Sequence, residues 1–457
     1  MMKIKDFFNT SATDNVKQAL ARAKEYADSN ALISLTEERA LERARLVDSG
    51  EITGRLMGVP FIVKDNFLAF GGPTTAASNM LKAFDAPIQA TAVEKLEAEG
   101  AICIGKANLD AFAHGGSTEN SAFGPTKNAA DASRVAGGSS GGSAVSVALD
   151  IVPFALGSDT GGSIRQPASF NGVVGVKPTY GMVSRFGVVA MASSTDTIGC
   201  FASNAADADL VMEIMAGQDR RDMTTLSGSW QPSPTFDRKK VGVIRQFMTD
   251  DVDADVKQAT LSYVERLKNL GYDVEEVDLD MAKYALAIYY IIVPAEVMSN
   301  LARYDGVHYG HRSEVANTLA DLYGKSRDEG FELENKRRIM IGSFVLSSGF
   351  FDAYYLKAQK ARTLLINEFK KLFETYDVLV GPVSPTPAFK LGENTSDPIK
   401  MYLADVMTVP ASIAGLPAMS IPHGTSSDGL PIGIQLIGNY RSDHSLLLLA
   451  SDVEDLV

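Results

Sequence analysis

The sequence predicts an α/β fold, in which amphipathic helices cover a largely buried central sheet. From residue 61 onward, short apolar runs alternate with longer stretches whose apolar residues recur at helical spacing. Short, continuously apolar runs are typical of strands buried on both faces, and their alternation with helices favours α/β architecture. Of the 457 residues, 45% are hydrophobic and 22% are charged, which is ordinary for a globular protein with a large core.

The chain begins with two predicted helices. Residues 11–14 read Ser-Ala-Thr-Asp, which has the form of a capping box, and helical periodicity then extends to Ala27. A second helix is expected over residues 37–47. Beyond them the sequence predicts strands over 61–63, 101–104, 151–156, 241–244 and 378–380, and helices over 91–99, 143–149, 254–269 and 354–374.

Two boundaries in this scheme depend on single residues. The strand over 101–104 is expected to end at Gly105, and Pro167 is expected to limit any helix that starts near Ile164 to a single turn. Residues 218–238 are polar and contain Pro232 and Pro234. This stretch is either a surface loop or a domain boundary, and the loop is favoured.

The composition excludes several classes of protein. The net charge is −13 and no stretch concentrates Lys and Arg, so the chain alone is a poor nucleic-acid binder. Cys103 and Cys200 form neither a disulfide framework nor a close-set metal-ligand pair, which fits a reducing cytosol. The first residues lack a signal-peptide run, and the most apolar window, 284–293, stops at Pro294 and is too short to cross a bilayer. We therefore expect a cytoplasmic protein.

Two serines lie 24 positions apart in a glycine-rich stretch. Residues 137–143 read Gly-Gly-Ser-Ser-Gly-Gly-Ser, and residues 157–167 read Gly-Ser-Asp-Thr-Gly-Gly-Ser-Ile-Arg-Gln-Pro. Glycine loses the most backbone entropy on folding, so folded domains concentrate it where the chain bends sharply or approaches a ligand. Its concentration around Ser139 and Ser163 predicts backbone N–H donors arranged around a serine nucleophile.

Such a serine needs a neighbouring base, and Lys64 is the candidate. It follows the apolar run 61–63, which is consistent with burial, and burial can lower the pKa of lysine from ~10.4 by roughly three units. We expect Lys64 to remove a proton from Ser139, and Ser139 to take one from Ser163, which attacks a carbonyl carbon. Histidine is the more usual base, and the histidines that could approach in space are His114, His308, His311, His423 and His444.

The residues that precede the second serine suit the other requirement of this chemistry. A tetrahedral oxyanion needs two or more N–H groups that point to one place, and each such donor contributes about 10²–10³ in rate. Glycines permit the backbone angles that this arrangement needs. The predicted oxyanion hole is formed by Thr160, Gly161, Gly162 and Ser163.

Other interpretations of these residues are weaker. A flexible Gly-Ser linker would not lie between strongly apolar segments, and a phosphate loop requires a lysine after its glycines. Residues 137–141 satisfy Gly-x-Ser-x-Gly, the nucleophile elbow of α/β-hydrolases, but the preceding residues 128–135 are polar rather than a strand. Lys64 could instead form a structural ion pair with the adjacent Asp65.

The stretch over residues 137–167, with Lys64 upstream, resembles the amidase signature family. In that family a lysine and two serines form a Ser-cisSer-Lys triad. The matching positions are Lys64, Ser139 and Ser163, with Ser163 as the nucleophile that carries the acyl group; the spacing favours Ser139 over Ser140 as the bridging serine. The resemblance also implies that no metal ion takes part.

The resemblance covers nearly the whole chain. It implies a large mixed central sheet covered by helices on both faces, and one amidase domain over residues 1–457 with its signature core at about 50–215. Within the family the chain is most similar to the glutamine-hydrolysing subunits of tRNA-dependent amidotransferases. This similarity rests on residues 115–121, 177–181, 183–187, 299–306, 336–340, 346–355 and 414–418.

That similarity implies a set of partners, the B and C subunits of such an amidotransferase. The glutamine-hydrolysing subunits pass ammonia to the B subunit, which uses ATP and Mg²⁺ to amidate glutamate or aspartate on misacylated tRNA, and the C subunit completes the heterotrimer. The resemblance implies that this chain binds no cofactor itself, contacts no membrane and reaches tRNA through the B subunit. A stand-alone amidase that acts on another small amide is the alternative, and an intact triad argues against a non-catalytic scaffold subunit.

Three further residues enter through the resemblance. Arg338 matches the position that holds the glutamine α-carboxylate, Asp405 matches the position that meets the α-ammonium, and Tyr289 matches a side chain that lines the pocket. The charges are physically consistent, because a zwitterion needs one cation and one anion, and the arginine fork can bind a carboxylate through two hydrogen bonds.

The chain departs from the family pattern in three places. His114 ends the run Asp-Ala-Phe-Ala-His where the family usually has methionine, which leaves the details of the substrate contacts open. Cys200 stands where proline is usual. The sequence also ends soon after Leu449, without the charged C-terminal helix that is customary in the family.

Overall fold

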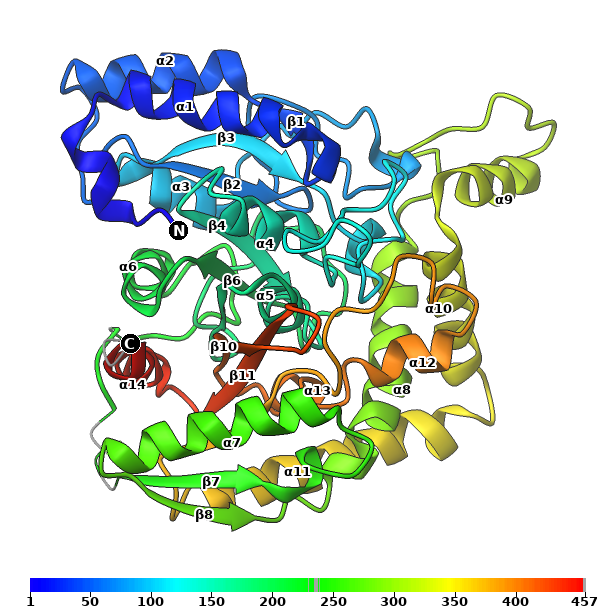
Figure 1. Cartoon of the computed structure of the whole chain (residues 1–457). Helices are drawn as coiled ribbons and strands as arrows, with labels where there is room; N and C mark the ends of the chain where they lie inside the picture. The colour runs from blue at the N-terminus through cyan, green and yellow to red at the C-terminus, as the bar shows by residue number, and fades with distance from the viewer. Residues whose placement is uncertain (229, 234–236, 238, 455–457) are drawn as a thin grey trace.

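The computed structural model describes residues 1–228, 230–233, 237 and 239–454, and it is built around an eleven-stranded sheet (Figure 1). The strands are β1 (Leu32–Leu35), β2 (Pro60–Lys64), β3 (Ile102–Ala107), β4 (Phe154–Asp159), β5 (Val174–Lys177), β6 (Thr197–Ala202), β7 (Lys240–Ile244), β8 (Asp273–Val277), β9 (Val378–Pro382), β10 (Ala418–Thr425) and β11 (Pro431–Gly438).

The sheet is mixed, with the strand order β1-β3-β2-β4-β6-β5-β10-β11-β9-β7-β8. Strands β3, β2 and β4 run parallel to one another, as do β9, β7 and β8. Between these groups, β6, β5, β10 and β11 pair antiparallel with their neighbours. The predicted α/β class with a large mixed sheet is therefore confirmed.

Helices cover both faces of this sheet, as predicted. They are α1 (Ala12–Glu25), α2 (Glu37–Asp48), α3 (Thr91–Ala98), α4 (Gly141–Ala148), α5 (Arg165–Asn171), α6 (Ala205–Met215), α7 (Ala254–Asn269), α8 (Ala282–Leu301), α9 (Leu319–Gly330), α10 (Leu333–Val345), α11 (Lys357–Leu372), α12 (Pro398–Leu403), α13 (Val409–Ala414) and α14 (Asp443–Glu454).

The two faces carry separate apolar cores, because successive side chains of a strand point to opposite faces. In β2, Phe61 and Val63 enter the larger core, which also contains residues of α3, α6 and α14. Ile62 between them enters the smaller core beneath α1, α2 and α4. Lys64 is thus the last residue of a strand that is buried on both sides.

Several predicted elements agree closely with the structure. The hydroxyl of Ser11 accepts the N–H of Asp14 at 3.1 Å, which caps α1 as expected. The predicted helix over 254–269 matches α7 residue for residue. The stretch 218–238 lies partly outside the described residues; within it, the indole of Trp230 is buried and donates to Asp209.

Other boundaries were predicted wrongly. Strand β3 continues through Gly105 to Ala107, and β4 begins at Phe154 rather than at residue 151. A helix, α5, forms where only a turn was expected, because Pro167 lies in its first turn, where a missing N–H costs nothing. The helix expected from residue 354 begins as a π-helical turn, and α11 proper starts at Lys357.

Helix α8 also corrects the sequence analysis, because it runs through Pro294 instead of ending there. It packs against α10, α11 and α13, and this burial outweighs the ~3 kcal/mol that an internal proline costs. Among the described residues, α8 is the one helix long and apolar enough to cross a membrane. Half of its most apolar window is buried within the structure, as in the core helix of a globular protein.

The contact between α8 and α10 gives a stability prediction. Gly342→Ala should destabilise the protein, because its Cβ would lie 2.0 Å from the carbonyl oxygen of Pro294, which is backbone and cannot rotate away. We expect a loss of about 1–3 kcal/mol in thermal unfolding, in spite of the higher helix propensity of alanine. Gly324→Ala in α9 is the matched control, since no atom lies within 4 Å of its Cβ, and it should be neutral or stabilising. Equal shifts in Tm for the two variants would contradict this packing argument.

Candidate active site

Lys64 lies at the end of β2, fully buried, and is joined to a serine. Its Nζ lies 2.7 Å from Ser139 Oγ and 3.0 Å from Ser158 Oγ. Burial lowers the pKa of Lys64 to about 7, although the carboxylates of Asp110, Asp159 and Asp196 oppose the shift. A substantial fraction of Lys64 is therefore neutral near pH 7 and able to accept a proton.

The peptide bond between Gly138 and Ser139 is cis, and it places Ser139 at the start of α4. A Cβ at Gly138 would lie 2.2 Å from Asp110 Oδ2, so only glycine fits there. The structure also distinguishes the two adjacent serines. Ser140 Oγ donates to the carbonyl of Ser158 at 3.2 Å, and of these two adjacent serines it is Ser139 that forms a hydrogen bond with Lys64.

Ser163 is joined to this pair through the backbone. Its carbonyl accepts the N–H of Ser140 at 3.2 Å, which ties the two serine loops together. Its hydroxyl makes no hydrogen bond with any residue that the structure describes, and the side chain is 8% exposed. The structure thus places the backbone of Ser163 against the loop that carries Ser139, and the Ser163 hydroxyl has no hydrogen-bond partner among the described residues.

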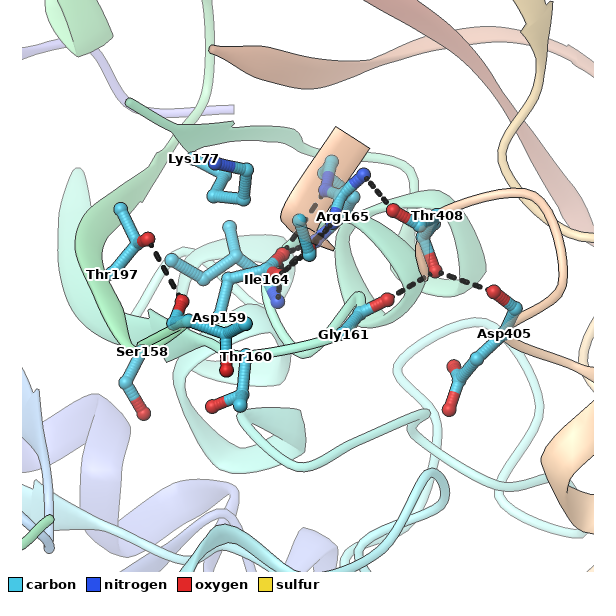
Figure 2. Close-up of polar contacts among 12 residues, drawn as sticks. Ser158, Asp159, Thr160, Gly161, Ile164, Arg165, Lys177, Thr197, Asp405 and Thr408 are labelled. Carbon is cyan, nitrogen blue, oxygen red and sulfur yellow. Dashed lines mark hydrogen bonds and ion pairs between the residues drawn. The ribbon is translucent and has the colours of Figure 1, made fainter. Parts of the chain in front are cut away.

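The loop before Ser163 turns its carbonyl groups toward protein partners. The carbonyl of Gly161 accepts the Thr408 hydroxyl at 2.7 Å (Figure 2). The carbonyl of Gly162 accepts the N–H of Gln166 at 2.9 Å. The Thr160 hydroxyl donates to Asp196. By contrast, the N–H groups of Gly161, Gly162 and Ser163 donate to none of the described residues. These three donors are free to bind an anion.

A buried ion pair anchors this loop, and the sequence analysis did not identify it. Arg165 and Asp159 are both fully buried and form two hydrogen bonds, at 3.0 and 3.1 Å (Figure 2). Arg165 also donates to the Thr408 carbonyl, Ser412 Oγ and Gln435 Oε1. Burial alone would raise the pKa of Asp159, but the charge of Arg165 outweighs it and holds that pKa below the usual range.

A cavity of about 200 Å³ opens beside the loop, lined by residues 115–120, α10 and α12. Arg338 and Asp405 both line it, as the resemblance implied. Asp405 lies close to residues 160–163, the predicted oxyanion loop, since a Cβ at Gly162 would be 3.4 Å from its Oδ1. Burial raises the pKa of Asp405 to about 7.

Tyr289 lies differently from the expectation that it lines the pocket. Its ring packs directly on the oxyanion loop, because a Cβ at Gly161 would lie 2.9 Å from its hydroxyl. Burial raises its pKa, so the phenol keeps its proton. The tyrosines among the residues that line the cavity are Tyr290, next to it in the chain, and Tyr402.

The side chains that hold Arg338 were not found from the sequence. Glu334 accepts Arg338 Nε at 2.9 Å and the Tyr402 hydroxyl at 2.9 Å, and it also pairs with Arg337. The guanidinium lies over the rings of Tyr290 and Tyr402, 5.4 and 5.8 Å from their centroids. Nε is engaged by Glu334, and the Tyr289 hydroxyl also forms a hydrogen bond with this guanidinium.

His114 is fully buried beside this pocket, where its Nδ1 contacts the Asn335 amide at 2.5 Å. Its Nε2 is buried without a hydrogen-bond partner. Burial, with a smaller contribution from the charge of Arg338, holds its pKa well below the usual range, so the ring is neutral. A neutral ring fits next to the cationic pocket wall.

The competing interpretations find no support in this geometry. The hydrogen bonds recorded for the other histidines lead away from the serines, to Asp305, Glu329, Ser262 and Asp209. Asp65 pairs with Lys106 at 3.1 Å rather than with Lys64. Cys103 and Cys200 are buried free thiols. Within the described part of the chain no cluster of His, Cys, Asp or Glu could hold a metal ion.

Comparisons with known proteins all point to one family. A family model described as Amidase matches residues 14–447. The chain is 51% identical to the A subunit of the glutamyl-tRNA(Gln) amidotransferase from Oceanobacillus iheyensis over 442 residues, which cover 95% of this chain and 90% of the relative. It is 49% identical to the same protein from Thermoanaerobacter pseudethanolicus, over 96% and 92% of the two chains. The crystal structure of the Thermotoga maritima counterpart superposes with a TM-score of 0.81 at 38% identity and covers 98% and 92%.

The charge state of Lys64 can be measured directly. Lys177 is a second fully buried lysine, whose Nζ donates to the carbonyl of Pro178, and burial lowers its pKa to about 7 as well. In ¹³C NMR of protein labelled at the lysine ε-carbons, we expect two resonances to titrate near pH 7. Lys64→Met should remove one and Lys177→Met the other. A Lys64 resonance that titrates near pH 10 would exclude it as a base.

Proposed function

The chain belongs to the amidase family, and we propose that it hydrolyses the side-chain amide of glutamine as the amidase subunit of a tRNA-dependent amidotransferase. The observation that carries the chemistry is the buried hydrogen bond between Lys64 and Ser139, in a loop whose backbone is hydrogen-bonded to that of Ser163. The choice of glutamine rests on relatives of about half-identical sequence that are amidotransferase subunits along nearly their whole length.

In the proposed mechanism, neutral Lys64 accepts a proton from Ser139 while Ser139 takes the proton of Ser163. Ser163 Oγ then bonds to the amide carbon of glutamine, and the carbonyl electrons move to oxygen. The free N–H groups of the loop 160–163 stabilise that oxyanion, each by about 10²–10³ in rate. The proton returns to the amide nitrogen as the C–N bond breaks, which releases ammonia and leaves an ester on Ser163. Water hydrolyses the ester to glutamate by the same proton path.

Two charged side chains that line the cavity would recognise the substrate. Arg338 would bind the α-carboxylate through its terminal nitrogens, and Asp405 would accept the α-ammonium. Asp405 is ionised only above its raised pKa, and a bound cation would favour that ionised form. Tyr289 would support the loop at Gly161 rather than contact the substrate chain, which refines the role that the resemblance implied.

The partners follow from the same proposal. Ammonia would pass to the B subunit of the amidotransferase, which uses ATP and Mg²⁺ on misacylated tRNA, and the C subunit would complete the assembly. The tRNA would meet the B subunit, since this chain is strongly acidic. The reaction would take place in the cytoplasm. Residues 1–457 would form one domain, since a single sheet contains strands from both the N-terminal and the C-terminal parts of the chain.

The test of this proposal measures glutamine hydrolysis by the chain alone and with its partner subunits. We expect glutaminase activity that increases in the complex, and its loss to background in Ser163→Ala, because no nucleophile remains. His308→Ala and His423→Ala are matched controls that should retain most activity. A chain that ignores glutamine with and without partners, but hydrolyses simple aryl or alkyl amides well, would instead be a stand-alone amidase.

The pH dependence separates two ionisations. Lys64 must be neutral and Asp405 ionised, and both have pKa values of about 7, so activity falls as pH decreases through 7. Because both protonations inactivate the free enzyme, log(kcat/KM) should approach a slope of 2 well below pH 6. Asp405→Asn should reduce that slope to 1 while raising KM. An acid limb that stays flat down to pH 5 would be incompatible with a lysine base.

A further inference from the structure

The oxyanion loop is oriented through its carbonyl oxygens. In a trans peptide unit the carbonyl oxygen and the N–H of the next residue point in opposite directions. The Gly161 carbonyl therefore sets the direction of the Gly162 N–H, and that carbonyl accepts the hydroxyl of Thr408 at 2.7 Å (Figure 2). Because the Gly161 oxygen is fixed on one side of the peptide unit, the Gly162 N–H points to the other side.

Thr408 is itself held on several sides. It is fully buried between α12 and α13. Its carbonyl accepts Arg165 Nη1 at 2.8 Å, and its hydroxyl lies so close to the loop that a Cβ at Gly162 would be 2.2 Å away. The Thr408 hydroxyl has two carbonyl oxygens within hydrogen-bond distance, that of Gly161 at 2.7 Å and that of Asp405 at 3.1 Å, and the shorter contact is the one with Gly161.

The same turn carries Asp405, the side chain proposed to bind the substrate ammonium. The N–H of Thr408 donates to the carbonyl of Asp405 at 3.1 Å, so the proposed ammonium site lies only three positions before the residue that supports the loop 160–163. The same turn therefore positions both Asp405, which would hold the ligand, and Gly162, whose N–H would meet the reacting carbonyl. The placement of the substrate and the placement of the donor are set together.

We propose that Thr408 is a positioning residue for catalysis: its hydroxyl fixes the Gly161 carbonyl and thereby aims the Gly162 N–H at the oxyanion. Thr408 does not touch the reacting atoms. The inference rests on the proposed amidase function, but not on glutamine being the amide, because the oxyanion of any amide would use the same donor.

The test compares Thr408→Val and Thr408→Ser. Valine preserves the shape but removes the donor, and it places a methyl group against the Gly161 oxygen. We expect kcat for glutamine to fall about 10- to 100-fold, somewhat below the effect of deleting a whole donor, with KM within about threefold. Serine keeps the hydroxyl and should restore most of kcat. Thr260→Val is the matched control, since Thr260 is also fully buried and donates to a backbone carbonyl, of Val256 in α7, at 2.9 Å.

Two readouts distinguish positioning from a structural role. An aldehyde analogue of glutamine, which forms a tetrahedral adduct with Ser163, should bind Thr408→Val more weakly by the same factor as kcat/KM. Glutamine binding to Ser163→Ala should be unchanged when Thr408→Val is added. A simple primary amide without α-substituents should lose the same factor in kcat/KM as glutamine.

Three results would overturn the proposal: kcat of Thr408→Val within threefold of wild type, no restoration by serine, or a loss in Thr260→Val as large as in Thr408→Val. The simple-amide measurement separates this inference from the proposed function. If the chain hydrolyses that amide but not glutamine, the choice of glutamine fails while Thr408 is still tested.

Discussion

The buried ion pair of Arg165 and Asp159 is the interaction on which the active site depends. Two charges without water contact are stable only when every polar atom has a partner, and here the partners come from β4, β11 and the α12–α13 region. Removing one partner of such a pair costs about 3–5 kcal/mol. The hydrogen bonds of the guanidinium thus tie the loop 160–163 to β11 and to the α12–α13 region.

Two opposing effects set the pKa of Lys64, the proposed base. Burial would make Lys64 neutral, and three nearby carboxylates would make it charged. Each carboxylate is engaged elsewhere: Asp110 accepts the N–H groups of Ser117, Thr118 and Asn120. Asp159 is paired with Arg165, and Asp196 accepts Thr160 and two backbone N–H groups. None of them forms a hydrogen bond with Lys64. Their attraction for its charge is therefore weaker than the effect of burial, and the pKa of Lys64 is lowered.

Sequence reasoning located the serines, the lysine and the alternating elements, because each leaves a local signal of glycine density, apolar run or periodicity. It missed Arg165, Thr408 and Glu334, whose meaning lies in contacts with distant parts of the chain. A mixed sheet was expected, but its central strands β6, β5, β10 and β11 were not located, and β5 is only four residues long. The helix boundaries at Pro294 and Pro167 were predicted wrongly. Tertiary packing overrides the usual effect of proline at Pro294, and the position in the first turn of a helix does so at Pro167.

The partners of Arg165 have a consequence for synthesis of the protein. The groups that complete its hydrogen bonding lie 243 to 270 residues further along the chain. At translation rates of about 5–20 residues per second, roughly 15–50 s pass between the emergence of the nucleophile loop and that of Gln435. Throughout that interval the nascent chain contains Lys64, Ser139 and Ser163 but lacks the partners that complete the hydrogen bonding of Arg165. The ion pair that anchors the loop 160–163 therefore acquires its full set of partners only late in synthesis.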